Sequence, residues 1–393
     1  MAKKTIRDIP LQGKRVVLRS EFNVPIKDGG IGDDIRIRAE LPTLRYILDQ
    51  GAAVLILTHL GRPKGKPAPE MSVKPVADRL ATLLGQPVGF IPYGAEEDIQ
   101  AAAAAIPFGQ AALLENTRFW AEEEKNDGEF SRFLSTLGDT YVNDAFGAAH
   151  RAHCSTEGIG HFLPAVAGFL MEKEIAALGE TVERPQRPFV VVMGGAKVSD
   201  KIALIENLAD KADEMLFGGA MANTLLAADG YAMGDSKIET DKLELVREMM
   251  ARVRQKKCRL VYPKDFVAAD EFSPDANIRV VAADQVPAGW MALDIGPVTV
   301  SDWAEIFAGA GTIIWNGPLG VYEMAPFAGG SNGVARAMAA SPGITVVGGG
   351  DAVAAARQAG CGEQMSHLST GGGASLELLE GKKLPGIEIL RDK

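Results

Sequence analysis

The first half of the chain alternates short apolar runs with longer amphipathic stretches. The runs at 15–18, 53–57, 111–114 and 141–142 have the length of buried strands, and 72–85 has the length and spacing of a helix. Strands that alternate with helices are typical of a parallel sheet covered on both faces. We therefore expect an α/β fold for this half.

The second half repeats the pattern and adds glycine-rich turns. Its apolar runs are 189–193, 215–217, 312–315, 344–347 and 367–368. Four of them lead into paired or triple glycines and then a helix-like segment, with the glycines at 194–195, 218–219, 348–350 and 371–373. The remaining run meets Asn316, Gly317 and Pro318. Any one such turn is more typical of a tight strand-to-helix connection, but four together predict a nucleotide site at one edge of a sheet.

The length of 393 residues predicts two domains, because single hydrophobic cores rarely grow that large. A charged, helix-like segment at 171–187, which ends at Pro185 and Pro188, is the expected connector and hinge. The predicted fold is two Rossmann-like domains with parallel sheets, each a three-layer α/β/α arrangement, joined by this helix. The first domain is expected to span 1–170.

Composition limits the function classes. The net charge of −10 disfavours a general nucleic-acid binder, since phosphate backbones select basic surfaces. Residues 1–170 hold 19 Lys and Arg against 21 Asp and Glu, so the acidic excess lies mainly in 171–393. The longest stretch without Asp, Glu, Lys or Arg, 306–322, contains four glycines and a proline, and we expect no membrane span.

The cysteines and the N-terminus indicate a reducing compartment, and we expect a cytoplasmic location. Cys154, Cys258 and Cys361 are few, odd in number and widely spaced, and no apolar segment follows the basic N-terminal residues. Zinc binding by His150, His153 and Cys154 is disfavoured because no second ligand group follows at suitable spacing.

Basic residues gather at the ends of the apolar runs in the first half. A single arginine is more often a surface or ion-pair residue, but four at the strand ends of one sheet would form a pocket for a small phosphorylated acid. These arginines are Arg36, Arg62, Arg118 and Arg151.

The segment GGAKVSDK at 194–201 places Lys197 and Lys201 four residues apart, in what we expect to be the first turns of a helix. Like charges repel at this spacing, and a helix N-terminus favours anions, so a bound anion is expected beside these lysines. A solvated helix face is the simpler alternative. The segment is neither the common phosphate loop nor a dinucleotide fingerprint.

Two rival functions come from other classes. The segment GGSNG at 329–333 matches the hydrolase nucleophile pattern, with Asp351 and His367 following in the required order, but no strand precedes Ser331. A non-catalytic nucleotide-binding module would account for the glycine turns and leave the four arginines without a purpose.

Over essentially its whole length the sequence resembles phosphoglycerate kinases. The motifs that carry this resemblance, in order, are FNVP (22–25), HLGRP (59–63), NDAFG (143–147), GAKV (195–198), WNGP (315–318), GGGD (348–351) and STGGGAS (369–375). The resemblance implies reversible phosphoryl transfer between 1,3-bisphosphoglycerate plus ADP and 3-phosphoglycerate plus ATP, by a hinge-closing monomer that uses Mg²⁺. It also implies that residues 371–393 return to the N-terminal domain, so that the nucleotide domain spans 171–370.

Carried over position by position, the resemblance implies the site residues. The phosphoglycerate pocket would comprise Glu21, Asn23, Arg36, His59, Arg62, Arg118 and Arg151. The nucleotide side would comprise Gly195, Ala196, Lys197, Lys201, Gly218, Gly219, Asn316, Glu323, Gly350, Asp351 and Ala352, with Asp351 on the metal–nucleotide complex. The phosphoryl group in transit would be stabilised by Arg36, Lys197, Gly371 and Gly372 with the start of the helix after Gly373.

Three positions depart from the usual pattern of that family. Glu21 stands where aspartate is usual, so its carboxylate lies one methylene further out. Ala220 replaces a glycine, and Ala352 replaces a hydroxyl residue that could donate to a nucleotide phosphate.

Overall fold

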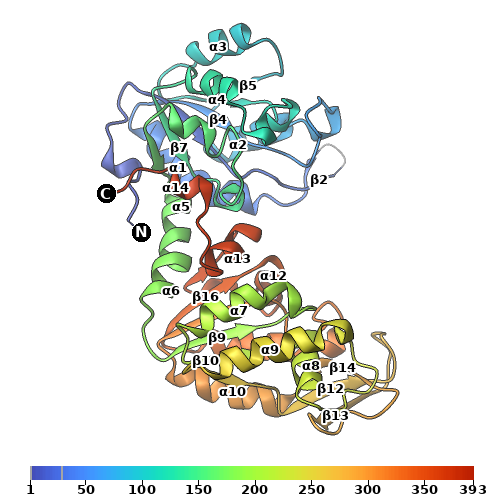
Figure 1. The fold of residues 1–393 in the computed structure, drawn as a ribbon. Coiled ribbons are helices and arrows are strands. Elements are labelled where there is room, and N and C mark those ends of the chain that lie inside the picture. The colour runs from blue at the N-terminus through green and yellow to red at the C-terminus, as the bar shows by residue number, and fades with distance from the viewer. Residues whose placement is uncertain (1, 28–29) are drawn as a thin grey trace. The chain divides into compact units, whose positions relative to one another are not determined.

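The computed structural model of the chain describes residues 2–27 and 30–393. The chain divides into two compact units (Figure 1). Unit 1 comprises the residues up to Ala176 together with Lys383–Lys393, and unit 2 comprises Ala177–Lys382.

Unit 1 is built on a six-stranded parallel sheet in the order β5-β6-β4-β1-β7-β8. Its strands are β1 (Arg15–Arg19), β4 (Ala53–Leu57), β5 (Val88–Ile91), β6 (Ala111–Leu114), β7 (Thr140–Asn143) and β8 (Ala165–Ala167). Its helices are α1 (Ile35–Asp49), α2 (Lys74–Leu84), α3 (Glu96–Ala104), α4 (Gly128–Ser135), α5 (Phe169–Glu174) and α14 (Pro385–Glu388). A short antiparallel pair, β2 (Ile26–Lys27) and β3 (Gly30–Ile31), precedes α1.

The central strands of this sheet are buried on both faces. Every residue of β4 is buried, so its side chains meet a core whichever way they point. On one face Val16, Leu18, Val54 and Ile56 pack with apolar residues of α1 and α2. A continuous apolar run of this kind is what a parallel sheet covered on both sides requires.

Unit 2 contains a second six-stranded parallel sheet, in the order β11-β10-β9-β15-β16-β17. Its strands are β9 (Phe189–Met193), β10 (Glu214–Phe217), β11 (Arg259–Val261), β15 (Thr312–Asn316), β16 (Ile344–Gly348) and β17 (His367–Leu368). Its helices are α6 (Thr181–Glu183), α7 (Ile202–Ala209), α8 (Gly219–Ala228), α9 (Leu243–Arg254), α10 (Pro297–Gly309), α11 (Gly329–Ala339), α12 (Gly350–Gln358) and α13 (Gly373–Leu379). The predicted α/β fold with two parallel sheets is confirmed.

Unit 2 also carries a three-stranded antiparallel sheet that the sequence pattern does not predict. It consists of β12 (Asp265–Ala269), β13 (Ile278–Ala282) and β14 (Met291–Ile295), in the order β13-β12-β14. All five residues of β13 are exposed or half-buried, so this edge strand lacks the apolar alternation that would reveal it.

The expected connector is helical. α5 continues into a π-helical turn, η7 (Ile175–Glu180), and then α6, and the division between the units falls inside this turn, after Ala176. No helix among the described residues is long and apolar enough to cross a membrane.

The C-terminal segment completes unit 1, where Figure 1 shows the red end of the chain close to the N-terminus. Leu384, Ile387 and Leu390 are buried with at most 3% of their surface exposed. The side-chain amide (Nδ2) of Asn143, at the end of β7, donates a hydrogen bond to the Gly386 carbonyl at 3.0 Å. The segment is thus part of the core of unit 1.

Removing residues 383–393 should therefore destabilise unit 1 and leave unit 2 intact. Three buried apolar side chains contribute about 1.5–3 kcal/mol each, so the expected loss is on the order of 5 kcal/mol. Hydrogen exchange read by mass spectrometry should show faster exchange in β1 and β8 and unchanged exchange in β9 and β15. Removal of residues 392–393 alone is the control and should change little. Equal loss of protection in both units would contradict this assignment.

Candidate functional site

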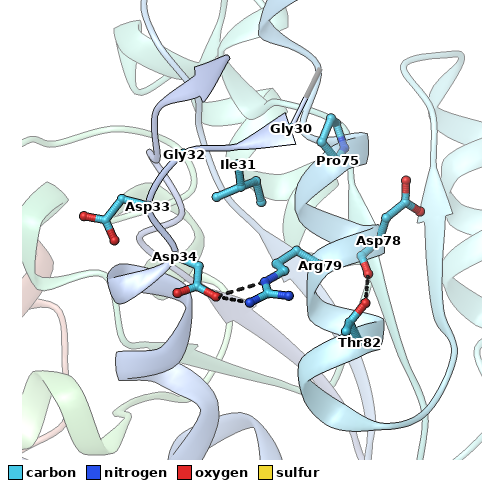
Figure 2. A pocket seen from close by; sticks show the side chains of 9 residues that line it. All are labelled: Gly30, Ile31, Gly32, Asp33, Asp34, Pro75, Asp78, Arg79 and Thr82. Carbon is cyan, nitrogen blue, oxygen red and sulfur yellow. Dashed lines mark hydrogen bonds and ion pairs between the residues drawn. The ribbon is translucent and has the colours of Figure 1, made fainter. Parts of the chain in front are cut away.

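The start of α1 is anchored before it reaches Arg36. Asp34, the N-cap residue of α1, accepts hydrogen bonds from Arg79 Nε at 2.9 Å and Nη2 at 2.5 Å, and from Arg38 Nε at 2.8 Å. Figure 2 shows Asp34 and Arg79 pointing toward each other beside a hollow that is lined by residues 30–34, which precede α1, and by α2. The hydrogen bonds from Arg38 and Arg79 lower the pKa of Asp34, so the carboxylate stays charged. This pairing fixes the position of the first turn of α1.

Arg36 lies beside two of the other predicted site residues. Its Nη1 donates to the Asn23 carbonyl at 2.6 Å and lies 3.6 Å from Glu21 Oε1. Its side chain is 40% exposed, so the guanidinium can still meet a ligand. The loop after β1 and the first turn of α1 therefore present Glu21, Asn23 and Arg36 together.

The loop after β4 joins this group. The Gly61 amide donates to Asn23 Oδ1 at 3.1 Å, and Arg118 Nη1 donates to the Gly61 carbonyl at 2.8 Å. His59, two residues before Gly61, is buried, and Arg62, directly after Gly61, is exposed. We call the seven residues that the resemblance assigns to the phosphoglycerate pocket the basic cluster: Glu21, Asn23, Arg36, His59, Arg62, Arg118 and Arg151.

Arg19, which the sequence motifs did not indicate, forms a hydrogen bond with His59. It is almost completely buried and donates to Ser155 Oγ at 2.9 Å, to the Ser20 carbonyl, and to His59 Nδ1 at 2.9 Å. A guanidinium cannot accept a hydrogen bond, so Nδ1 must be the acceptor and the neutral ring carries its proton on Nε2. Arg19 is the last residue of β1, the same strand-end position that singled out the other arginines.

A buried carboxylate balances Arg19. Glu123 is fully buried and accepts from the Ser155 amide at 3.0 Å and from Ser155 Oγ at 2.5 Å. Ser155 therefore links the carboxylate to the guanidinium. Burial raises the pKa of Glu123, and the charge of Arg19 opposes this shift.

Burial, reinforced by nearby positive charge, lowers the pKa of two histidines, His59 and His153. Burial, followed by the charges of Arg19 and Arg118, holds the pKa of His59 well below its ordinary value of 6.5. Burial and the same two arginines lower the pKa of His153 to about 3, and Arg151 acts in the same direction on both rings. Arg151 is thus close enough for its charge to act on both histidines. Together these arginines form a positive surface that favours binding of an anion.

In unit 2 a cavity of about 490 Å³ lies among the turns that follow the parallel strands. This volume suits a nucleotide-sized ligand. Of the residues expected on the nucleotide side, it is lined by Gly195, Ala196, Gly219, Glu323 and Asp351. Other lining residues, which the motifs did not indicate, include Asp235, Lys237, Phe272, Met291 and Leu293. Several of these come from the small antiparallel sheet and its loops.

Glycine is required where these turns approach one another. Gly219 has φ +65°, and a Cβ there would lie 2.8 Å from the Pro318 carbonyl oxygen. Gly317 has φ +87°, and a Cβ would lie 2.3 Å from the Gly194 carbonyl oxygen. The turns after β9, β10 and β15 can therefore close on each other only without side chains.

The two lysines occupy different environments, and the predicted helix begins later than expected. Lys197 lies in an exposed loop, Lys201 ends a 3₁₀ turn, η8 (Ser199–Lys201), and α7 starts only at Ile202. Lys201 Nζ donates to the Gly194 carbonyl at 2.8 Å and to Asn316 Oδ1 at 2.6 Å. Burial lowers the pKa of Lys201 to about 8, although the charge of Asp351 opposes this. Lys201 therefore holds the turns together, while Lys197 is accessible.

The remaining predicted residues support the turns. Asn316 Nδ2 donates to the Gly348 carbonyl at 3.1 Å and so joins β15 to β16. The Gly218 amide donates a hydrogen bond to the Met193 carbonyl, and Gly350 begins α12. Ala352 is completely buried and belongs to the hydrophobic core of unit 2.

The turn at 371–373 begins α13. Gly372 has φ +52° and is the N-cap residue of this helix. The Gly371 amide donates to Ser369 Oγ at 3.1 Å and is thus engaged within the turn. Unit 2 places this turn after β17, on the same sheet as the glycine turns after β9 and β10.

The hydrolase alternative fails on local structure. Ser331 lies inside the first turn of α11, is completely buried, and accepts a hydrogen bond from the Leu319 amide at 3.1 Å. A 3₁₀ turn, η10 (Ala325–Phe327), precedes it instead of a strand. Ser331 therefore has neither the elbow nor the exposure of a nucleophile.

The lowered pKa values of His59, in the basic cluster, and of His153, beside it, give a direct spectroscopic prediction. In the free protein the imidazole resonances of His153 should not shift between pH 5 and pH 8, because its pKa is lowered to about 3, and any midpoint of His59 should lie well below 6.5. In the unfolded chain the two histidines regain the ordinary pKa of about 6.5 and take up protons below it. The free energy of unfolding should therefore decrease as the pH falls below 6.5, because only the unfolded state binds these protons. NMR of histidine-labelled protein measures the first effect, with urea-unfolded protein as control. A midpoint near 6.5 for either ring would contradict the assignment.

Comparison with known proteins gives one consistent result. The model of the family described as phosphoglycerate kinase matches residues 6–382. A phosphoglycerate kinase of Moorella thermoacetica is 54% identical over 393 residues, and one of Roseiflexus castenholzii is 55% identical over 394 residues, with both chains covered completely in each case. Among solved structures, phosphoglycerate kinase from Coxiella burnetii matches with a TM-score of 0.92 at 42% identity, covering 98% of each chain.

Proposed function

Because the chain belongs to the phosphoglycerate kinase family, we propose that its two units divide the two substrates of that reaction between them. The reaction is the reversible transfer of a phosphoryl group between 1,3-bisphosphoglycerate plus ADP and 3-phosphoglycerate plus ATP. Unit 1, with the basic cluster, takes the phosphoglycerate. Unit 2, with the cavity among the glycine turns, takes the nucleotide.

The observation that carries the first assignment is the electrostatic environment of His59 and His153. Burial and the charges of Arg19, Arg118 and Arg151 lower the pKa of both rings. The arginines thus create a positive surface that a small dianion would neutralise. In the proposed binding mode Arg36, Arg62, Arg118 and Arg151 bind phosphate and carboxylate oxygens. His59 donates from Nε2, and Glu21 and Asn23 contact the glycerate hydroxyl and backbone. A nucleotide-binding module without a second substrate would not need this cluster.

The nucleotide is proposed to lie in the 490 Å³ cavity, against Gly195, Ala196 and Gly219. Gly218 comes directly before Gly219 in the same turn and is proposed to contribute to the nucleotide side. Lys201 and Asn316 hold the turns beneath it, and Glu323, Gly350 and Asp351 contact it from the remaining side. Lys197, which is exposed beside the cavity lining, is free to reach the phosphates. These assignments use backbone amides and lysines, the groups that suit phosphate.

Magnesium is proposed to arrive with the nucleotide. Asp351 lies in the first turn of α12, is exposed, and lines the cavity. Among the described residues no group of three or more His, Cys, Asp or Glu could hold an ion by itself. One carboxylate is what Mg²⁺ needs when phosphates and water supply its other ligands, so the residues present fit the ion. When bound, it would neutralise charge on the phosphates.

The transfer itself needs positioning and charge stabilisation by the protein, without a covalent intermediate. An acyl phosphate is already a good donor, so the chain has to align the attacking oxygen of the nucleotide and compensate the charge of the group in transit. We assign this to Arg36 from unit 1 and to Lys197 with the turn of Gly371 and Gly372 from unit 2. We further propose that the protein acts as a monomer in the cytoplasm, where its three free cysteines would remain reduced.

Lys197→Ala should lower kcat by about 100-fold to 1,000-fold and change the KM for ATP much less. The expected size is that of losing one contact to a developing charge. A coupled assay of ATP-dependent acyl phosphate formation from 3-phosphoglycerate measures both constants and tests the proposed reaction in the wild type. Lys257→Ala, which removes another exposed lysine of unit 2, is the matched control. If kcat of Lys197→Ala stayed within a factor of about three, the role of Lys197 would be wrong.

Because the two proposed half-sites lie on different units, transfer over a distance of about 3–3.5 Å requires the units to approach during turnover. Either ligand alone should shift the population partly, and both together much further. Small-angle X-ray scattering should give the smallest radius of gyration for the complex with 3-phosphoglycerate, an unreactive ATP analogue and Mg²⁺. The free protein and the two binary complexes are the comparison. Equal radii in all four samples, with binding verified separately, would contradict closure.

A further inference from the structure

Helix α1 carries two ionisable side chains one turn apart that have opposite environments. Arg36 is 40% exposed at the basic cluster, whereas Glu40 is only 1% exposed. On the buried side of the same helix Leu41, Leu44 and Ile47 form part of the hydrophobic core. A carboxyl group at such a position is costly unless it makes a specific interaction.

That interaction is with the backbone of the loop after β1. Glu40 Oε1 accepts a hydrogen bond from the Glu21 amide at 2.5 Å. The neighbouring amide, that of Phe22, donates to Thr58 Oγ1 at 3.0 Å, and Thr58 in turn donates to the Ser20 carbonyl at 2.9 Å. Two buried side chains from different elements therefore hold the loop just before Asn23.

The charge state of Glu40 is set by its surroundings. Burial, followed by the charge of Asp144, raises the pKa of Glu40 well above 4.5, and Glu21 acts in the same direction. Burial raises the pKa of Asp144 to about 7, and Glu172 also acts upward on it. Glu40 Oε2 and Asp144 Oδ2 have no hydrogen-bond partner among the residues described. A protonated Glu40 removes most of the repulsion in this group of carboxyls and still accepts through its carbonyl oxygen.

We propose that Glu40 is a positioning residue for the phosphoglycerate half-site: its buried carboxyl holds the Glu21 amide and thereby fixes the loop that presents Glu21 and Asn23 to the substrate. This proposal rests on the proposed function of the basic cluster. Glu40 itself does not touch the ligand in this arrangement.

The proposal gives the longer side chain at position 21 a structural context. A glutamate has one more rotatable bond than the aspartate usual in this family, and so loses more freedom when it is ordered. Glu40 fixes the backbone of Glu21, while Arg36 lies 3.6 Å from its carboxylate. Restraint at both ends favours one orientation of the side chain.

The test compares three substitutions of Glu40 that differ in hydrogen-bond acceptor and in side-chain length. Glu40→Gln keeps a neutral acceptor at the same reach, Glu40→Met keeps the length without an acceptor, and Glu40→Asp withdraws the carboxyl by one methylene. We expect Glu40→Gln to retain the wild-type KM for 3-phosphoglycerate. Glu40→Met and Glu40→Asp should raise it about tenfold, with the KM for ATP unchanged, because a buried amide loses its acceptor.

The outcomes separate positioning from simple stability. If Glu40→Gln raised the KM for 3-phosphoglycerate as much as Glu40→Met, or if all three variants changed both KM values equally, the proposal would be overturned. Should Glu40→Met fail to fold, the comparison of Glu40→Asp with Glu40→Gln decides alone. Failure of the proposed function is distinguishable, because the wild type would then lack activity with 3-phosphoglycerate in the same assay.

A pH series provides the second readout. An acid whose pKa is raised on folding stabilises the native state fully below its unfolded value and loses that contribution as the pH rises through its folded value. The wild type should therefore lose stability relative to Glu40→Gln between about pH 4.5 and the raised pKa. A constant difference between the two proteins over pH 5–8 in urea unfolding would show that Glu40 is ionised, and would overturn its assignment as a neutral acceptor.

Discussion

Parallel pairing brings the carboxyl end of every strand in a sheet to the same edge, and the chemistry of each unit depends on that constraint. In unit 1 it gathers the residues after β1, β4, β6 and β7, which are separated by as much as 130 residues in sequence. In unit 2 it gathers the glycine turns after β9, β10, β15 and β16. The ligand surfaces are therefore consequences of topology, and individual side chains only determine which ligand fits.

Much of this arrangement could be predicted from the sequence, because buried parallel strands are continuous apolar runs. Runs such as 53–57 and 189–193 coincide with β4 and β9. Three of the missed strands lack this signal: β8 is only three residues long, β5 contains Gly89, and β13 is largely exposed. Short or exposed strands are defined by their neighbours in space, which periodicity does not record.

Some residues of the candidate site could be predicted from the sequence, whereas others could not. Residues directly after a strand, such as Gly218 and Gly219 after β10, follow from position and residue type, and Arg19, the last residue of β1, could have been found by the same criterion. Arg36 was predicted at a strand end but lies in the first turn of α1. Contributions from the small antiparallel sheet, such as Met291 in the cavity of unit 2, could not be predicted, because nothing local marks them. Likewise, the burial of Glu40 depends on the loop that folds over it. In each case the missing information is a contact between segments distant in the sequence.

Both units place ionised or ionisable groups in buried or largely buried positions. In unit 1 the guanidinium of Arg19 is balanced by Glu123 through Ser155, and in unit 2 Lys201 is bound by backbone and amide oxygens. Burial of Asp294 in unit 2 raises its pKa to about 7, although the Gly330 and Ile295 amides donate to it. Such groups tolerate burial because their hydrogen bonds are made within the protein, and they impose one geometry on the loops around them.

The return of the last residues to unit 1 has a consequence for how the chain is made. A ribosome delivers the chain from its N-terminus, and domains generally fold as units during synthesis. Unit 2 ends at Lys382, while unit 1 needs Leu384, Ile387 and Leu390 to complete its core. Most of unit 1 is therefore synthesised before unit 2 but can be completed only after it, and until then unit 1 exposes an apolar surface that residues 383–393 later cover.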